Sequence, residues 1–143
     1  MIISELFYQE IAQLLSDVDQ SVSKIKDVRE QMRAFIVQLS RGIVENNDFF
    51  KVYVARLTDE AEKPGTTKMI TTFFDGYVGR LKAIIEQGIA SGAFRKVDAE
   101  SIARASFSLM VGSIFMKHVM KVDLDLDYQN KTQIDLLLEA IKK

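Results

Sequence analysis

The chain has 143 residues, of which 48% are hydrophobic and 27% charged, and its formal net charge is -1. This length fits one domain with a substantial core, and the balanced charge disfavours a protein that grips a phosphate backbone by itself. The sequence has no Cys and one His, which excludes disulfides, thiolate nucleophiles and sulfur-ligated zinc. We therefore predict no metal site and no cofactor.

The sequence also bears on location. No run of about 18 apolar residues is present, so no membrane-spanning segment and no membrane partner are predicted. The opening residues, Met1-Ile2-Ile3-Ser4-Glu5, lack a basic region followed by a long apolar run, and no secretory signal is expected. A cytoplasmic location is the resulting prediction.

Apolar residues recur at a spacing close to 3.6 along almost the whole chain, which is typical of amphipathic helices. Asp27 and Asp98 are expected to cap the starts of two helices, and Gly92 is expected to end one with a positive φ. The turn Lys63-Pro64-Gly65 separates two further helices. Helices are predicted at about residues 3–22, 27–46, 49–60, 67–91, 98–120 and 129–141. The fold class that follows is an all-α, six-helix bundle, with residues 1–143 forming a single domain.

The fifth predicted helix differs from the others. From Ile102 to Met116 its residues are apolar or small on almost every side, so the helix must be covered on several sides. Its apolar surface exceeds what one core can use, so a second copy of the chain is expected to cover the surplus.

Catalytic and metal-binding patterns are weak. No base and nucleophile can be paired, so an enzyme is disfavoured. Phe115 stands three residues before His118, where a di-iron bundle would need Glu. Asp123, Asp125 and Asp127 imitate the start of a calcium loop, but Tyr128 occupies the position that requires glycine. His118 near a helix end is either a pH-sensitive group or, more commonly, a partly exposed helix residue.

One stretch resembles a known family. The segment Ile85-Glu86-Gln87-Gly88-Ile89-Ala90-Ser91-Gly92-Ala93-Phe94-Arg95, followed by Asp98-Ala99-Glu100-Ser101-Ile102-Ala103, resembles the C-terminal half of bacterial TetR-family transcriptional regulators. In that family a Glu-x-Gly-x-x-x-Gly-x-Phe/Leu pattern ends a long helix, and a turn with Asp leads into an apolar helix containing glycine, here Gly112. Ser4-Glu5-Leu6-Phe7 resembles the point where the family's DNA-binding domain joins the first helix of the ligand domain.

The resemblance implies a function. It predicts an effector-binding and dimerisation domain of a repressor, without the helix-turn-helix domain that precedes this region in the family. DNA would then be bound only through a domain that these residues do not contain. In the family the last two helices pair with their copies across a two-fold axis, and a self-complementary homodimer of this kind would bury the apolar surface of the fifth and sixth predicted helices. The residues expected at that interface are Leu109, Ser113, Met116, Ile134, Leu137, Leu138 and Ile141.

The family also places an effector in a cavity inside each subunit, and the occupied cavity shifts a two-state equilibrium.

Bulky, adaptable side chains on three of the predicted helices suit such a cavity and point to a small hydrophobic or aromatic effector. Tyr77 is the expected polar contact, through its hydroxyl. The residues predicted to line the cavity are Met32, Phe35, Ile36, Phe73, Tyr77, Phe107, Met110 and Ile114. Any single one of them is more commonly a plain core residue. The alternative for the whole chain is therefore a stand-alone helical protein-interaction module without a ligand.

Overall fold

The structure is a computed structural model, which describes residues 3–46 and 66–143. These residues form the helices α1 (Ile3–Ser23), α2 (Val28–Glu45), α4 (Thr66–Ala90), α5 (Ala99–His118) and α6 (Leu126–Ile141). The prediction of an all-α fold is confirmed for this part of the chain. The helix predicted at residues 49–60 lies outside the described residues, as does the turn at Lys63-Pro64-Gly65.

The predicted signals at helix ends are confirmed. The Asp27 side chain accepts a hydrogen bond from the backbone N–H of Arg29 at 2.8 Å, and Asp98 accepts one from Ser101 at 3.1 Å. Each carboxylate thereby satisfies a donor that the first turn of a helix leaves unpaired. Gly92 has a φ of 82°, the left-handed conformation that glycine adopts without a steric penalty.

The last helix begins earlier than predicted. It starts at Leu126 rather than near residue 129, because Asp125 caps it by accepting from the N–H groups of Asp127 and Tyr128. Of the three alternating aspartates, Asp123 therefore lies in the loop, Asp125 caps the helix, and Asp127 lies in its first turn.

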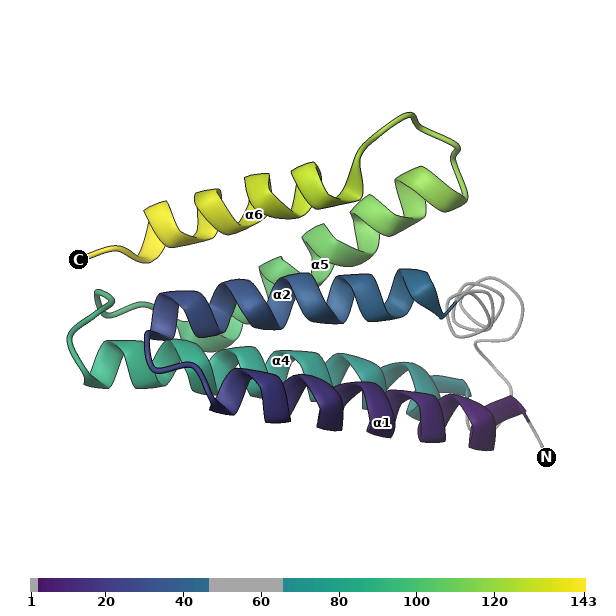
Figure 1. Cartoon of the computed structure of the whole chain (residues 1–143), viewed down its shortest axis with the longest axis horizontal. Helices are drawn as coiled ribbons and strands as arrows, with labels where there is room; N and C mark the ends of the chain where they lie inside the picture. The colour runs from purple at the N-terminus through teal and green to yellow at the C-terminus, as the bar shows by residue number, and fades with distance from the viewer. Residues whose placement is uncertain (1–2, 47–65) are drawn as a thin grey trace.

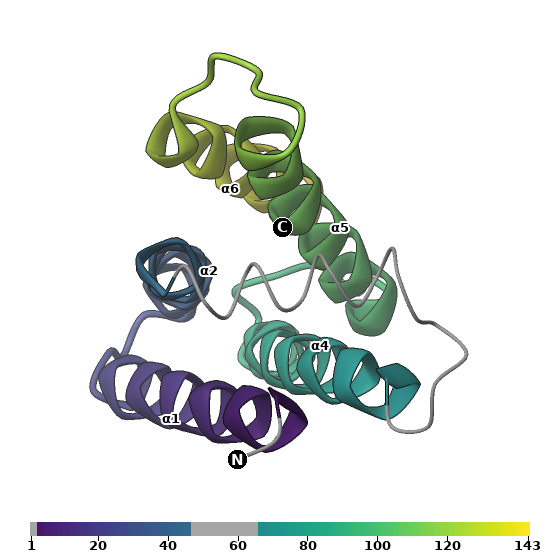
Figure 2. The same cartoon turned by 90° about the vertical axis from the view of Figure 1, so that its right-hand side faces the viewer.

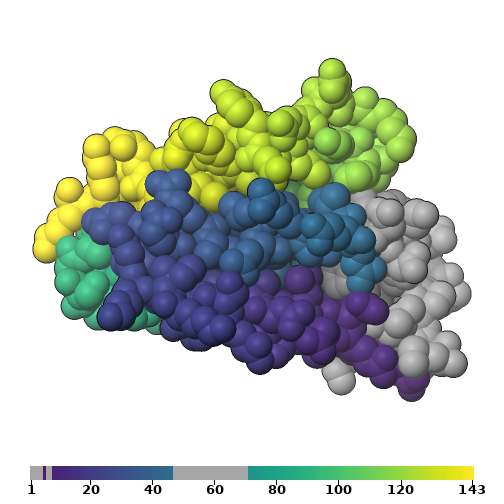
Figure 3. Space-filling view, in the orientation of Figure 1, coloured from purple at the N-terminus to yellow at the C-terminus, as the bar shows by residue number. Residues whose placement is uncertain are grey.

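The helices are arranged around α2 and α4. Helices α1, α2 and α4 run alongside one another, and α6 lies on the side of α2 away from α1 (Figure 1). Viewed end-on, α5 extends from α4 towards α6 (Figure 2), and it packs against both. On the face drawn in Figure 3, α1, α2 and α6 form neighbouring bands of surface. None of the described helices is long and apolar enough to cross a bilayer.

One continuous hydrophobic core joins all five described helices. Its largest fully buried side chains come mainly from α2, α4 and α5 and include Phe35, Phe73 and Tyr77. Full burial of one such side chain contributes about 1.5–3 kcal/mol. The packing of α2, α4 and α5 around these side chains therefore contributes a large part of the hydrophobic stabilisation of the fold.

Candidate functional site

The residues predicted to line an effector cavity come together in the structure. Three lie on α2, two on α4 and three on α5, and each is at most 9% exposed. The eight are Met32, Phe35, Ile36, Phe73, Tyr77, Phe107, Met110 and Ile114. Their convergence on one interior region follows from the packing of α2 against α4 and of α4 against α5.

Aromatic rings form the centre of this region. The ring of Phe107 lies 5.4 Å from Phe73, 5.1 Å from Phe74 and 5.4 Å from Tyr77, in edge-to-face orientations. Tyr77 in turn lies 5.1 Å from Phe35 on α2. These separations and angles are those that aromatic quadrupoles favour. We call these five residues the aromatic cluster.

A chain of buried polar side chains starts at this cluster. The Tyr77 hydroxyl is 2.6 Å from the Ser106 hydroxyl, which donates to Oε1 of Gln133 at 3.2 Å. Gln133 donates through Nε2 to Oδ1 of Asn130 at 3.3 Å, and Asn130 donates to the Ser40 hydroxyl at 2.9 Å. We call this chain the polar relay. It connects α4, α5, α6 and α2 in that order.

The environment of Tyr77 favours its neutral form. Burial raises the pKa of the Tyr77 hydroxyl well above its ordinary value, while the hydrogen bond with Ser106 lowers it by a smaller amount. An apolar surrounding disfavours the phenolate because the charge loses its hydration. Tyr77 therefore keeps its proton and remains a hydrogen-bond donor over the physiological pH range.

A groove of about 360 Å³ opens between α1, α2 and α4. Phe35 contributes to its lining, and Phe35 is also a member of the aromatic cluster. At its rim Arg80 donates through Nε to both carboxylate oxygens of Asp19, at 2.9 and 3.0 Å. The groove therefore combines an apolar wall that borders the aromatic cluster with a polar rim, a combination that is common in small-molecule sites.

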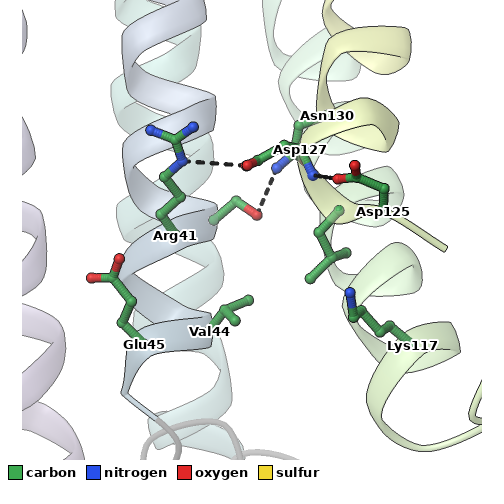
Figure 4. A pocket seen from close by; sticks show the side chains of 9 residues that line it. Arg41, Val44, Glu45, Lys117, Asp125, Asp127 and Asn130 are labelled. Carbon is green, nitrogen blue, oxygen red and sulfur yellow. Dashed lines mark hydrogen bonds and ion pairs between the residues drawn. The ribbon is translucent and has the colours of Figure 1, made fainter.

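A second groove, of about 280 Å³, lies between α2, the end of α5 and the start of α6. Figure 4 shows Arg41 on α2 reaching across to Asp127 on α6, a contact of 3.3 Å. Lys117 on α5 donates to the backbone carbonyl of Leu124 at 3.0 Å. Ser40 and Asn130, the far end of the polar relay, also line this groove. The relay thus runs from the aromatic cluster to a surface groove.

Sequence reasoning missed most of the relay. It identified Tyr77 but not Ser40, Ser106, Asn130 or Gln133. Helical spacing could have pointed to Asn130 and Gln133, because they occupy the same face of the last helix as Ile134 and Leu137. Polar residues on a core-facing stripe are expected to be hydrogen-bonded to one another or to neighbouring helices.

The residues predicted at a dimer interface divide into two groups. Ser113, Ile134, Leu137 and Ile141 are at most 6% exposed and fill the chain's own core. Leu109 is 42% exposed, and Met116 and Leu138 are half-buried. The two groups differ because the apolar stripe of α6 faces α2 and α5 rather than outwards. The large hydrophobic side chains of α6 that are exposed are Tyr128 and Leu136, at 69% and 62%.

The described residues leave part of α5 uncovered, in line with its surplus of apolar surface. A side chain added at Gly112 would meet no atom within 4 Å, so nothing in the described part of the chain packs closely there. Ala105 and Ser108 are exposed on the same helix. Small residues and Leu109 thus face outwards on α5 while Phe107, Met110 and Ile114 face the core.

Comparison with known proteins identifies the family. The family model described as "Tetracyclin repressor-like, C-terminal domain" matches residues 26–114, which is more than half of the chain. The chain belongs to this family. The TetR resemblance of residues 85–103 is therefore confirmed. The family consists of regulators rather than enzymes, in line with the prediction of a non-enzymatic domain. No curated protein sequence matches the chain.

Solved structures share the fold. The transcriptional regulator FadR from Bacillus subtilis, in complex with stearoyl-CoA, is similar with a TM-score of 0.80 and 16% identity, covering 97% of this chain and 74% of FadR. A TetR-family regulator from Syntrophomonas wolfei has a TM-score of 0.79 and 16% identity, with coverages of 96% and 69%. The fatty acid degradation regulator FadR from Bacillus halodurans has a TM-score of 0.79 and 15% identity, with coverages of 95% and 73%. The TM-scores establish a common fold for this TetR-type domain and these structures, and at such low identities the likeness concerns the fold alone.

Proposed function

We propose that this TetR-type domain binds an effector with a long apolar part, and that fatty acyl thioesters are the leading class. The observation that carries the proposal is the convergence of eight buried apolar and aromatic residues from α2, α4 and α5 on one interior region. A similar fold binds stearoyl-CoA in Bacillus subtilis FadR, which supports the choice of class.

The interior is suited to admit an apolar chain. Met32 and Met110 are unbranched and polarizable, so they can change conformation at low cost when a ligand displaces them. The groove between α1, α2 and α4 has Phe35 in its lining, so the aromatic cluster borders a groove that is open to solvent. Tyr77 supplies a hydroxyl that can orient a polar group within an otherwise apolar site.

We also propose that two copies of the chain pair through α5 and α6. The uncovered side of α5 around Leu109 and Gly112 and the exposed side chains of Leu136 and Tyr128 supply the surface. We propose that the buried members of the predicted interface, Ser113, Ile134, Leu137 and Ile141, stabilise the subunit rather than the pairing. In this arrangement the domain controls a DNA-binding domain, so that effector binding changes the geometry of a paired repressor.

Calorimetric titration tests the effector class. Stearoyl-CoA should bind the chain with a dissociation constant in the micromolar range or tighter, whereas coenzyme A without an acyl chain should bind far more weakly. Phe107→Leu should weaken stearoyl-CoA binding at least about tenfold because it removes a ring that contacts three others. Glu86→Gln, an exposed change on α4, is the control. Equal binding of both ligands would contradict an apolar interior site.

A further inference from the structure

The hydrogen bonds of the polar relay all run in one direction. The amide oxygen Oε1 of Gln133 can only accept, so the single hydroxyl proton of Ser106 is directed to it. The 2.6 Å contact between Tyr77 and Ser106 must then use the Tyr77 proton. The raised pKa of Tyr77 agrees, because it keeps that proton in place. Donation therefore proceeds from Tyr77 through Ser106, Gln133 and Asn130 to Ser40.

This direction leaves Tyr77 with only its oxygen lone pairs for any further partner. An effector group that donates a hydrogen bond to Tyr77 extends the relay unchanged. An effector group that accepts, such as the carbonyl oxygen of an acyl thioester, competes with Ser106 for the single Tyr77 proton. If the effector takes this proton, Ser106 loses its donor and its own proton can turn to the Tyr77 oxygen, which would leave Oε1 of Gln133 without the hydrogen bond that it accepts.

The relay passes through α6, the helix that also carries the exposed Leu136 and Tyr128. Gln133 and Asn130 are 3% and 2% exposed on the inner side of α6, and they link it to Ser106 on α5 and Ser40 on α2. Removing a partner from such buried polar groups is costly, and hydrogen bonds in series strengthen one another. A continuous set of hydrogen bonds therefore links the bonding state of the Tyr77 hydroxyl to α6.

We propose that the polar relay is a conformational device that couples occupancy of the interior beside Tyr77 to the position of α6. In this proposal, an acceptor group on the effector takes the hydrogen bond of the Tyr77 hydroxyl. The packing of α6 against α2 and α5 changes as a result. The nature of the signal rests on the proposed function, whereas the coupling between the two ends of the relay is a property of the chain alone.

A double-mutant cycle tests the coupling without a ligand. Tyr77→Phe and Ser40→Ala alter opposite ends of the relay and share no direct contact in it. Their effects on the unfolding equilibrium constant should deviate from simple multiplication by at least about threefold, since each variant disturbs the same series of bonds. If the change in the double variant equals the product of the two single changes within about twofold, the two sites are independent, and the proposal of a relay is wrong.

Ser113→Ala provides the matched control for this cycle. Ser113 on α5 is buried like Ser40, with exposures of 5% and 2%. Its hydroxyl, however, donates to the carbonyl of Leu109 in its own helix at 2.7 Å. When Ser113→Ala is combined with Tyr77→Phe, the change in the unfolding equilibrium constant should equal the product of the two single changes within about twofold. If this pair deviates from the product as much as Tyr77→Phe with Ser40→Ala does, the coupling is a general property of the core, and the proposal of a relay is wrong.

Hydrogen exchange with stearoyl-CoA as probe tests the signal. In the wild-type chain the probe should change the exchange of amides in α6. In Gln133→Leu, which breaks the link between α5 and α6 while keeping Tyr77 and Ser106, this change should disappear. An unchanged response in Gln133→Leu would overturn the proposal. If stearoyl-CoA fails to bind the wild-type chain, the proposed effector class is wrong, and the mutant cycle alone decides the coupling.

Discussion

The ring of Phe94 packs directly over the backbone of Gly88. A Cβ at Gly88 would overlap the ring carbons Cδ2 and Cε2, and the N–H of Phe94 donates to the Gly88 carbonyl at 3.0 Å. The Arg29 guanidinium lies 5.8 Å from the centre of the same ring, on its way to the carbonyl of Ala93. The Gly-x-x-x-Gly-x-Phe pattern is thus a junction between the end of α4 and the start of α2.

Substitution of Gly88 should destabilise the fold. Gly88→Ala forces the buried Phe94 ring to move, and we expect a loss of about 1–3 kcal/mol in the free energy of unfolding. Gly79→Ala is the matched control on the same helix, because a side chain there meets no atom within 4 Å. Alanine at this exposed helical position should add about 0.5–1 kcal/mol. Urea unfolding of both variants checks this, and equal effects would contradict the contact.

Stability should fall at alkaline pH partly because of Tyr77. Its folded-state pKa is raised above the unfolded value of 10.0, so above that pH the unfolded chain releases a proton that the folded chain retains. This contribution is complete below pH 10 and is lost above it, by up to about 1.4 kcal/mol per pH unit. Tyr77→Phe should show a shallower alkaline decline in urea unfolding between pH 9 and 11. An identical decline would show that other groups cause it.

Two neighbouring leucines on α6 should respond differently to a negative charge. Leu136 is 62% exposed, so Leu136→Glu should leave the subunit folded but separate the proposed dimer. Leu137 is 6% exposed, so Leu137→Glu buries an unpaired carboxylate and should unfold the chain. Sedimentation and circular dichroism distinguish the two results. A Leu136→Glu protein that remains dimeric would move the interface away from this side of α6.

The cap of α5 should be measurable by itself. Asp98→Ala removes the acceptor for the Ser101 N–H, with an expected loss of about 0.5–2 kcal/mol. Asp98→Asn keeps a side-chain oxygen in place and should cost much less. Thermal unfolding of the two variants makes the comparison. A loss of similar size in both would assign the effect to the negative charge near the helix N-terminus rather than to the hydrogen bond.

The helical pattern and its end signals were readable in the sequence because they depend on neighbours a few residues apart. Asp27, Asp98 and Gly92 act on their own helix termini, and the 3.6-residue spacing brought together the apolar residues of α2, α4 and α5. The start of α6 was misplaced because Leu126 is followed by Asp127 and Tyr128, which do not continue its apolar stripe.

Tertiary structure decided which side of each stripe is covered. Periodicity identified Ile134, Leu137 and Ile141 as one apolar face, but only the packing of α6 on α2 and α5 showed that this face fills the subunit. The polar relay likewise joins residues up to 90 positions apart, Ser40 and Asn130. Helical spacing specifies which residues share a face, whereas the partner of that face depends on how the helices cross, which local sequence does not encode.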